Sequence, residues 1–306
     1  MNILITGGAG FIGSHIVDAY LKLGHRVVIL DNLSSGKKEN IPPKAVFYEM
    51  DLLDPQVETL IKDENIEVIN HHAAQISVIR SVTHPREDAN INILGSIKLL
   101  ELAKSSTVRK FIFASTGGAI YGLQDSFPAD ENHACRPESP YAISKFSVEN
   151  YLNFYSKTYG LDTITLRYSN VYGPRQDPHG EAGVVAIFCQ KLLKNSQPTI
   201  FGDGEQTRDF VSVQDVAQAN VVALNSSLTG IFNISTGKET TVNELLQNLA
   251  KMAGNNGKPQ LAAARKGELQ RSVIDSGKFQ KNTDWSPKIS LQEGLEKTYA
   301  FFETQI

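Results

Sequence analysis

Short apolar runs alternate with amphipathic stretches along the first half of the chain. Each run is four to seven residues long and ends in glycine or polar residues, as buried strands do. The runs lie at residues 2–6, 26–30, 45–48, 67–70, 110–114 and 162–168. After the first run, Ile12, Ile16 and Tyr20 recur at helical spacing, and this pattern stops at Gly24. The alternation predicts an α/β fold with a doubly wound parallel sheet between two layers of helices.

Longer amphipathic stretches predict the remaining helices. Residues 85–104 fit one long helix, and Ser139-Pro140 fits an N-cap and first helical proline for a helix ending near Tyr159. In the less regular second half, 174–183 fits a loop, and helices are predicted at 184–194, 242–252 and 292–302. We expect a sheet domain at 1–168, to which 212–236 returns, and a smaller α/β substrate-binding domain at 169–211 and 237–306.

Composition and charge narrow the function classes. Hydrophobic residues make up 41% of the 306, enough to build an ordinary globular core. A net charge of −3 and the lack of a basic stripe disfavour nucleic acid as a partner. No apolar run approaches the length of a membrane span, and no basic leader opens the chain. Two cysteines, Cys135 and Cys189, cannot form a disulfide framework. We expect a cytoplasmic protein.

A glycine-rich turn follows the first predicted strand. Gly7, Gly10 and Gly13 lie where a strand passes into a helix, and the amide groups of that helix N-terminus attract a diphosphate. Asp31 ends the next strand, where a carboxylate accepts bonds from ribose hydroxyls and repels a 2′-phosphate. These features predict a Rossmann-type domain that binds NAD in preference to NADP. The alternative is a turn without a ligand, with Asp31 as a local cap.

Tyr141 and Lys145 lie four residues apart on the predicted helix, so they share one face. Such a pair is weak evidence by itself, since an ordinary core tyrosine beside a solvated lysine has the same spacing. The strand end at Ser115 and Thr116 adds hydroxyl groups at the edge of the sheet where α/β folds bind ligands.

These motifs resemble those of the extended short-chain dehydrogenase/reductase superfamily, and within it those of the UDP-glucose 4-epimerase (UDP-galactose 4-epimerase) family. The resemblance extends through nearly the whole chain. Its matching segments are 6–13, 31–33, 51–52, 72–75, 115–122, Tyr141 with Lys145, 166–174, 204–211 and 265–268.

The resemblance implies a tightly held NAD that is reduced and reoxidised within each turnover. Tyr141 would take the proton of the sugar C4 hydroxyl while hydride leaves C4, and the 4-keto sugar would then rotate and take the hydride back. A phenol with a pKa near ~10 is protonated at neutral pH, so Lys145 and the positive nicotinamide are expected to lower that pKa. The implied cofactor contacts are Gly7, Gly10, Phe11, Ile12, Gly13, Asp31, Asn32, Asp51, Leu52, Ala73, Ala74, Gln75, Asn92, Tyr141 and Lys145.

One position departs from the common epimerase pattern. The usual assisting hydroxyl, counted back from Tyr121, falls on Gly117, so we expect Thr116 to assist and Ser115 to be second choice. Either hydroxyl could instead bond the backbone at the strand end. Gly117-Gly118 also lacks the acid pair that nucleotide-sugar dehydratases carry for elimination, which favours an epimerase.

The resemblance further implies how a nucleotide sugar is bound. Arg208 and Arg265 would bind the pyrophosphate, Asn170 a phosphate or nearby group, and Thr116 and Tyr141 the sugar. Glu268 would bind a nucleotide ribose, although the family usually has Asp there. A small Ser272, where some members carry Tyr, leaves room for an N-acetyl group and predicts that UDP-GlcNAc or UDP-GalNAc is accepted. For each arginine the alternative is an ordinary ion pair.

Other functions and features stay open. The chain could epimerise a GDP- or CDP-linked sugar, or be a non-catalytic NAD-binding scaffold, although intact Tyr141 and Lys145 disfavour a scaffold. His71, His72 and His179 lack metal-ligand spacing, so no metal is expected. The family commonly dimerises through the helices at 85–104 and 139–159, which implies a homodimer.

Overall fold

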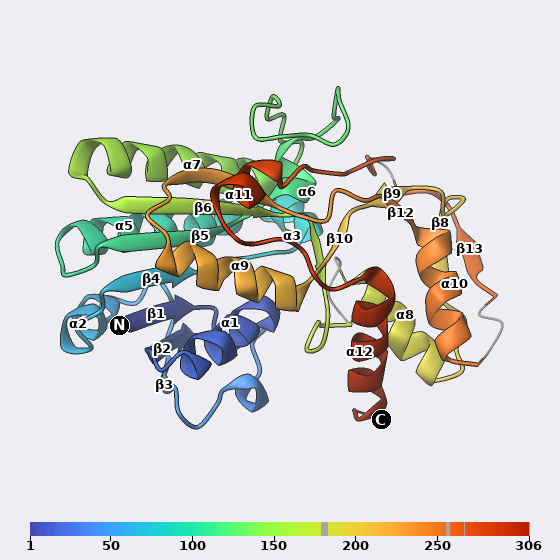
Figure 1. Cartoon of the computed structure of the whole chain (residues 1–306), viewed down its shortest axis with the longest axis horizontal. Coiled ribbons are helices and arrows are strands. Elements are labelled where there is room, and N and C mark those ends of the chain that lie inside the picture. Colours follow the sequence, from blue (N-terminus) through green and yellow to red (C-terminus); the bar gives the residue numbers. More distant parts are fainter. Residues whose placement is uncertain (179–182, 255–257, 266, 306) are drawn as a thin grey trace.

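The computed structural model describes residues 1–178, 183–254, 258–265 and 267–305. Its centre is a parallel sheet of seven strands in the order β11-β6-β5-β4-β1-β2-β3 (Figure 1). The strands are β1 (Asn2–Thr6), β2 (Arg26–Asp31), β3 (Val46–Glu49), β4 (Val68–His71), β5 (Lys110–Thr116), β6 (Asp162–Tyr168) and β11 (Gly230–Ile234). The predicted doubly wound Rossmann-type fold is confirmed.

Helices cover both faces of this sheet because both faces are apolar. Ile3 and Ile5 face the layer of α1 (Phe11–Lys22) and α9 (Val213–Asn225). Leu4 belongs to the opposite core, which includes residues of α2 (Val57–Asp63), α5 (Gly95–Lys104) and α7 (Pro140–Tyr159). The carboxyl ends of the strands therefore form a shared edge, where a ligand can lie.

The long helix predicted over 85–104 is confirmed, with a π turn inside it. It consists of α4 (Pro85–Ala89), a π-helical turn η2 (Asn90–Leu94) and then α5. The sequence did not predict the π turn, whose Asn92 side chain bonds Gln75 outside the helix. Such turns are frequent at functional sites.

The second half builds a smaller unit beside the carboxyl edge of the sheet (Figure 1). Its core consists of apolar side chains of α8 (Val184–Leu193), α10 (Val242–Met252) and α12 (Leu291–Glu303). The bounds of these helices agree with the predicted ones to within one residue. Three two-stranded sheets accompany them: β7 (Asn170–Tyr172) with β10 (Phe210–Ser212), β9 (Thr207–Arg208) with β12 (Thr240–Thr241), and β8 (Thr199–Phe201) with β13 (Gln260–Ala262).

The described residues also form four short helices: η1 (Lys38–Asn40), α3 (Val78–Thr83), α6 (Gly117–Ile120) and α11 (Gly277–Asn282). The chain crosses between the two units more than once, because α9 and β11 return to the large sheet after β10. In the described ranges, no helix is long and apolar enough to cross a membrane. Part of the loop predicted at 174–183, including His179, lies outside the described residues.

Candidate active site

The glycine turn between β1 and α1 is packed against the loop that follows β4. Gly7 has a φ of +69°, and a Cβ there would lie 2.7 Å from the backbone nitrogen of Ala73. A Cβ on Gly13 would lie 2.2 Å from the Gly7 carbonyl oxygen. Both positions therefore require glycine, and the amide groups at the start of α1 stay open to a diphosphate.

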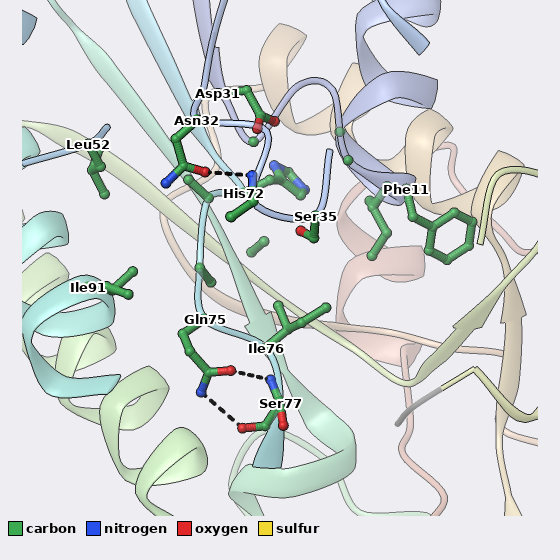
Figure 2. Close-up of a pocket in the computed structure, with 18 of the residues that line it drawn as sticks. Phe11, Asp31, Asn32, Ser35, Leu52, His72, Gln75, Ile76, Ser77 and Ile91 are labelled. Atoms are coloured by element: carbon green, nitrogen blue, oxygen red, sulfur yellow. Dashed lines mark hydrogen bonds between the residues drawn. The ribbon is translucent and has the colours of Figure 1, made fainter. Parts of the chain in front are cut away.

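A cleft of about 530 Å³ runs along this edge of the sheet (Figure 2). It collects the glycine turn, the ends of β2, β4 and β5, and the start of α7. The predicted site residues that line it are Gly7, Gly10, Phe11, Ile12, Gly13, Asp31, Asn32, Asp51, Leu52, Ala73, Ala74, Gln75, Ser115, Tyr141 and Lys145. A cradle that needs glycine, with a carboxylate near one end and a Tyr–Lys pair in the same cavity, fits NAD.

At the β2 end of the cleft, the carboxylates of Asp31 and Asp51 accept hydrogen bonds that fix the surrounding loops. The Asp31 carboxylate accepts the backbone N–H of Ala9 at 3.0 Å and that of Leu33 at 2.8 Å. Asn32 donates its side-chain amide to Asp51 at 2.9 Å. Asp31 is buried and lines the cleft, so its remaining lone pairs are available to ribose hydroxyls.

Tyr141 and Lys145 lie together at the other end of the cleft. The Lys145 ammonium donates to the Ala114 carbonyl at 2.9 Å and lies 6.0 Å from the centre of the Tyr141 ring. Burial lowers the pKa of Lys145 to about 8, although Asp88 and Glu149 favour its charge. Burial, and secondarily Asp88, raises the pKa of Tyr141. The lowering of the Tyr141 pKa that was expected from the sequence is therefore not produced by these protein groups alone.

The two candidate hydroxyls at the end of β5 differ in their surroundings. Ser115 donates to Glu149 at 2.6 Å, and Glu149 also accepts two bonds from Arg167, at 2.9 and 2.6 Å. Thr116 is half-buried, and its hydroxyl makes no hydrogen bond to the described residues. The Ser115 hydroxyl is thus engaged inside the protein, which leaves Thr116 as the freer group.

Asn92 and Gln75 form a pair of reciprocal hydrogen bonds that holds the loop after β4. The Gln75 N–H donates to Asn92 at 2.8 Å, and Asn92 donates back to the Gln75 carbonyl at 2.9 Å. The fully buried Asp88 accepts bonds from both side chains and from Ser144 of α7. Asn92 lies behind the lining of the cleft and orders the loop. Asp88 could not be identified from the sequence, since no local pattern marks an acceptor shared by three side chains.

His72 and Tyr168 also line the cleft. The His72 ring stacks on Tyr168, and its Nε2 lies 3.1 Å from the Tyr168 hydroxyl. Burial, with the charge of Lys145, lowers the pKa of His72 to about 3. Within the described residues, no group of three His, Cys, Asp or Glu could hold a metal ion.

Of the predicted substrate-side residues, Tyr141 lines this cleft and Thr116 ends β5. The other five do not line it and lie in the smaller unit or at its junction: Asn170, Arg208, Arg265, Glu268 and Ser272. Arg208 and Glu268 form an ion pair at 3.4 Å, and the Arg265 guanidinium lies 4.2 Å from the centre of the Phe201 ring. The Asn170 side chain is beside the α6 turn, since a Cβ on Gly118 would lie 3.5 Å from its Oδ1. Ser272 is buried. Lys266 of the same motif lies outside the described residues.

Comparison with known proteins gives consistent matches. A "Putative UDP-glucose 4-epimerase" from Methanocaldococcus jannaschii is 50% identical over 295 residues, 96% of each chain. The solved UDP-glucose 4-epimerase of Thermotoga maritima, with UDP-glucose, is 48% identical, covers 100% of this chain and 99% of its own, and superposes with a TM-score of 0.97.

A UDP-N-acetylglucosamine 4-epimerase from Methanobrevibacter ruminantium, solved with UDP-N-acetylmuramic acid, is also similar. It is 37% identical, covers 100% of this chain and 99% of its own, and has a TM-score of 0.95. The family model described as "NAD dependent epimerase/dehydratase family" matches residues 3–235. With its glycine turn, Asp31 and Tyr–Lys pair in one cleft, the chain belongs to the NAD-dependent epimerase/dehydratase family.

Proposed function

We propose that the chain interconverts UDP-galactose and UDP-glucose by epimerisation at C4. The observation that carries this proposal is the single cleft shared by the glycine turn, Asp31, Tyr141 and Lys145. NAD, when bound, supplies a hydride acceptor and donor. The relatives named above are described as 4-epimerases of UDP-sugars, which supports the same reaction here.

Each catalytic residue has a role that its position supports. Tyr141 accepts the proton of the C4 hydroxyl as C4 becomes a ketone, and returns it when the 4-keto sugar is reduced on its other face. Lys145 stabilises the phenolate and donates a hydrogen bond to the nicotinamide ribose. Asp31 accepts bonds from the adenosine ribose. Thr116 assists Tyr141, because the Ser115 hydroxyl is engaged with Glu149.

On the substrate side, Arg208 binds the diphosphate. Burial lowers the pKa of this guanidinium, and its ion pair with Glu268 is 3.4 Å long, so an anionic ligand would satisfy a charge that is poorly compensated. Arg265 contributes a second cation, Asn170 binds near the phosphate, and Glu268 binds the nucleotide ribose. Ser272 leaves space for an N-acetyl group, so UDP-GlcNAc and UDP-GalNAc are further substrates. The similar N-acetylglucosamine enzyme supports this extension.

We also propose a homodimer built on η2 and α7, which contact each other. Large apolar side chains are exposed on these elements: Leu94 (54%), Ile143 (48%), Tyr151 (40%), Phe154 (49%) and Tyr159 (48%). Apolar side chains exposed on neighbouring helices are a feature of protein–protein interfaces. Light scattering should give twice the chain mass. The division at 1–168 plus 212–236, and the cytoplasmic location, stay predictions.

The experiment is to incubate the purified protein with UDP-galactose, without added NAD, and to separate the sugars by chromatography. We expect conversion to UDP-glucose, lost in Tyr141→Phe while NAD stays bound. No conversion by a protein that holds NAD would refute the UDP-hexose assignment and direct the assay to GDP-, CDP- or N-acetylated sugars. Equal activity in Tyr141→Phe would refute the role of the phenol.

A further inference from the structure

Gly117 stands at the position where a hydroxyl residue is usual. The space that a side chain would take there is occupied by the side chain of another residue. A Cβ on Gly117 would lie 2.3 Å from Cδ1 of Ile274, although its nearest backbone atoms would be at ordinary distances of 3.4 and 3.5 Å. Gly117 and Ile274 are both buried. The volume that a serine or threonine would need here is therefore occupied by the end of the isoleucine side chain.

Hydrogen bonds hold the backbone around Ile274 on both sides, so Cδ1 can yield only by rotation of the side chain, which packs against the buried Tyr121 and Ala129. The Ile274 carbonyl accepts the Ser235 hydroxyl at 2.7 Å. On either side of Ile274, the Val273 carbonyl accepts the Ala129 N–H at 3.1 Å, and the Asp275 N–H donates to the Ala129 carbonyl at 2.8 Å. We call residues 268–276 the strap. It links the smaller unit to the large sheet, since its Ser272 carbonyl accepts the Asp209 N–H at 3.1 Å.

The turn that Ile274 contacts consists of residues 116–121. It begins with Thr116, which precedes α6, and ends at Tyr121. Ser115, just before the turn, is tied to Glu149. Tyr121 accepts a bond from Arg167 at 2.9 Å and donates to Asn233 at 2.8 Å. The two ends of the turn are thus fixed by hydrogen bonds, whereas Ile274 packs against the glycine directly after Thr116.

We propose that Ile274 is a positioning residue that sets the place of the Thr116 hydroxyl through its contact with Gly117. This inference rests on the proposed epimerase function. The strap also carries Ser272 and Glu268, so the substrate pocket and the turn with the assisting hydroxyl share one packed contact. Gly117, which departs from the family pattern, is then the contact partner of Ile274. The assisting hydroxyl is supplied by Thr116, one residue earlier in the sequence.

A size exchange between the two side chains tests the contact. In Gly117→Ala the new methyl must move about 1 Å to reach an ordinary distance from Ile274, and displacements of that size can cost up to ~100-fold in rate. We expect kcat to fall at least about tenfold, with KM and bound NAD unchanged. Ile274→Val deletes the single atom in conflict, so Gly117→Ala with Ile274→Val should recover kcat to within about threefold of wild type.

The matched control is Gly118→Ala in the same turn. Its Cβ would meet Asn170 at 3.5 Å, an ordinary contact, so kcat should change less than about threefold. If Gly117→Ala does not fold, Ile274→Val alone probes the contact from the other side, with an expected decrease in kcat of about threefold at constant KM. A double variant no more active than Gly117→Ala, or single variants with wild-type kcat, would overturn the proposal.

A double-mutant cycle of Thr116→Ala with Gly117→Ala tests whether the loss of kcat arises from displacement of the Thr116 hydroxyl. Thr116→Ala should lower kcat strongly in the wild-type chain and much less in Gly117→Ala, where the hydroxyl is already displaced. Equal losses in both backgrounds would assign Ile274 a purely structural role. An inactive wild-type protein would instead refute the proposed function, so the two failures are distinguishable.

Discussion

Replacing Glu149 by glutamine should destabilise the protein more than any surface charge change. Glu149 and Arg167 form an ion pair of 2.6 Å, with side chains only 1% and 2% exposed. Glutamine keeps the size and one acceptor oxygen for Ser115, but it removes the negative charge. Arg167 is then left as a buried cation, because its other partners are the neutral Tyr121 and Cys135.

The expected magnitude follows from the distance. At 2.6 Å and an effective dielectric constant of about 20, the lost attraction is about 6 kcal/mol. Part of this is returned, since the neutral amide no longer carries the desolvation cost of a buried carboxylate. A net loss of about 3–5 kcal/mol is typical for breaking such a pair. For a chain of 306 residues that corresponds to a midpoint roughly 5–8 °C lower.

The assay is thermal unfolding followed by circular dichroism, with Glu58→Gln as the matched control. Glu58 pairs with Lys62 at 2.6 Å, but the two side chains are 54% and 60% exposed, so its loss should barely move the midpoint. Replacing both Glu149 and Arg167 by methionine should recover much of the stability, because no charge is then left unpaired. A Glu149→Gln midpoint within about 2 °C of wild type would refute the reasoning.

Three further predictions concern the cofactor, the substrate and pH. Gly13→Ala places a Cβ 2.2 Å from the Gly7 carbonyl, so the purified variant should retain little NAD, measured by absorbance after denaturation; full retention would contradict the packing of the turn. Ser272→Tyr should lower kcat/KM for UDP-GalNAc at least about tenfold more than for UDP-galactose, and equal losses would argue against a pocket at this position. The pKa of buried Lys145 is about 8, below its value in the unfolded chain, so the unfolded state binds more protons between about pH 8 and 10.5. Stability of the NAD-free protein should therefore rise with pH across that window, by up to ~1.4 kcal/mol per pH unit, and Lys145→Met should lose this rise in urea unfolding at pH 7.5 and 9.5.

Much of the cofactor half could be predicted because its signals are local. The run at Asn2–Thr6, the glycines after it and Asp31 lie close together in sequence, and each keeps its predicted place in the structure. Tyr141 and Lys145 could be paired for the same reason, since helical geometry alone brings them to one face.

What could not be predicted depends on partners distant in sequence. The π turn at Asn90–Leu94 follows from the bonds that Asn92 makes to Gln75, and no periodicity reports them. The engagement of Ser115 needs Glu149, which is 34 residues away. The sequence marks Gly117 as a departure from the family pattern. It does not show why glycine stands there, because the side chain that occupies the space, Ile274, is more than 150 residues away.

The position of β11 has a consequence for how the chain is made. β11 begins at Gly230, about 60 residues after its neighbour β6 ends at Tyr168, and the segments between them belong largely to the smaller unit. A chain growing from its N-terminus therefore completes the residues of the cleft while β6 is still a bare edge, with unpaired backbone groups open to another nascent chain. Until β11 pairs with β6, this inner strand of the finished sheet can mispair, so that hazard is specific to synthesis.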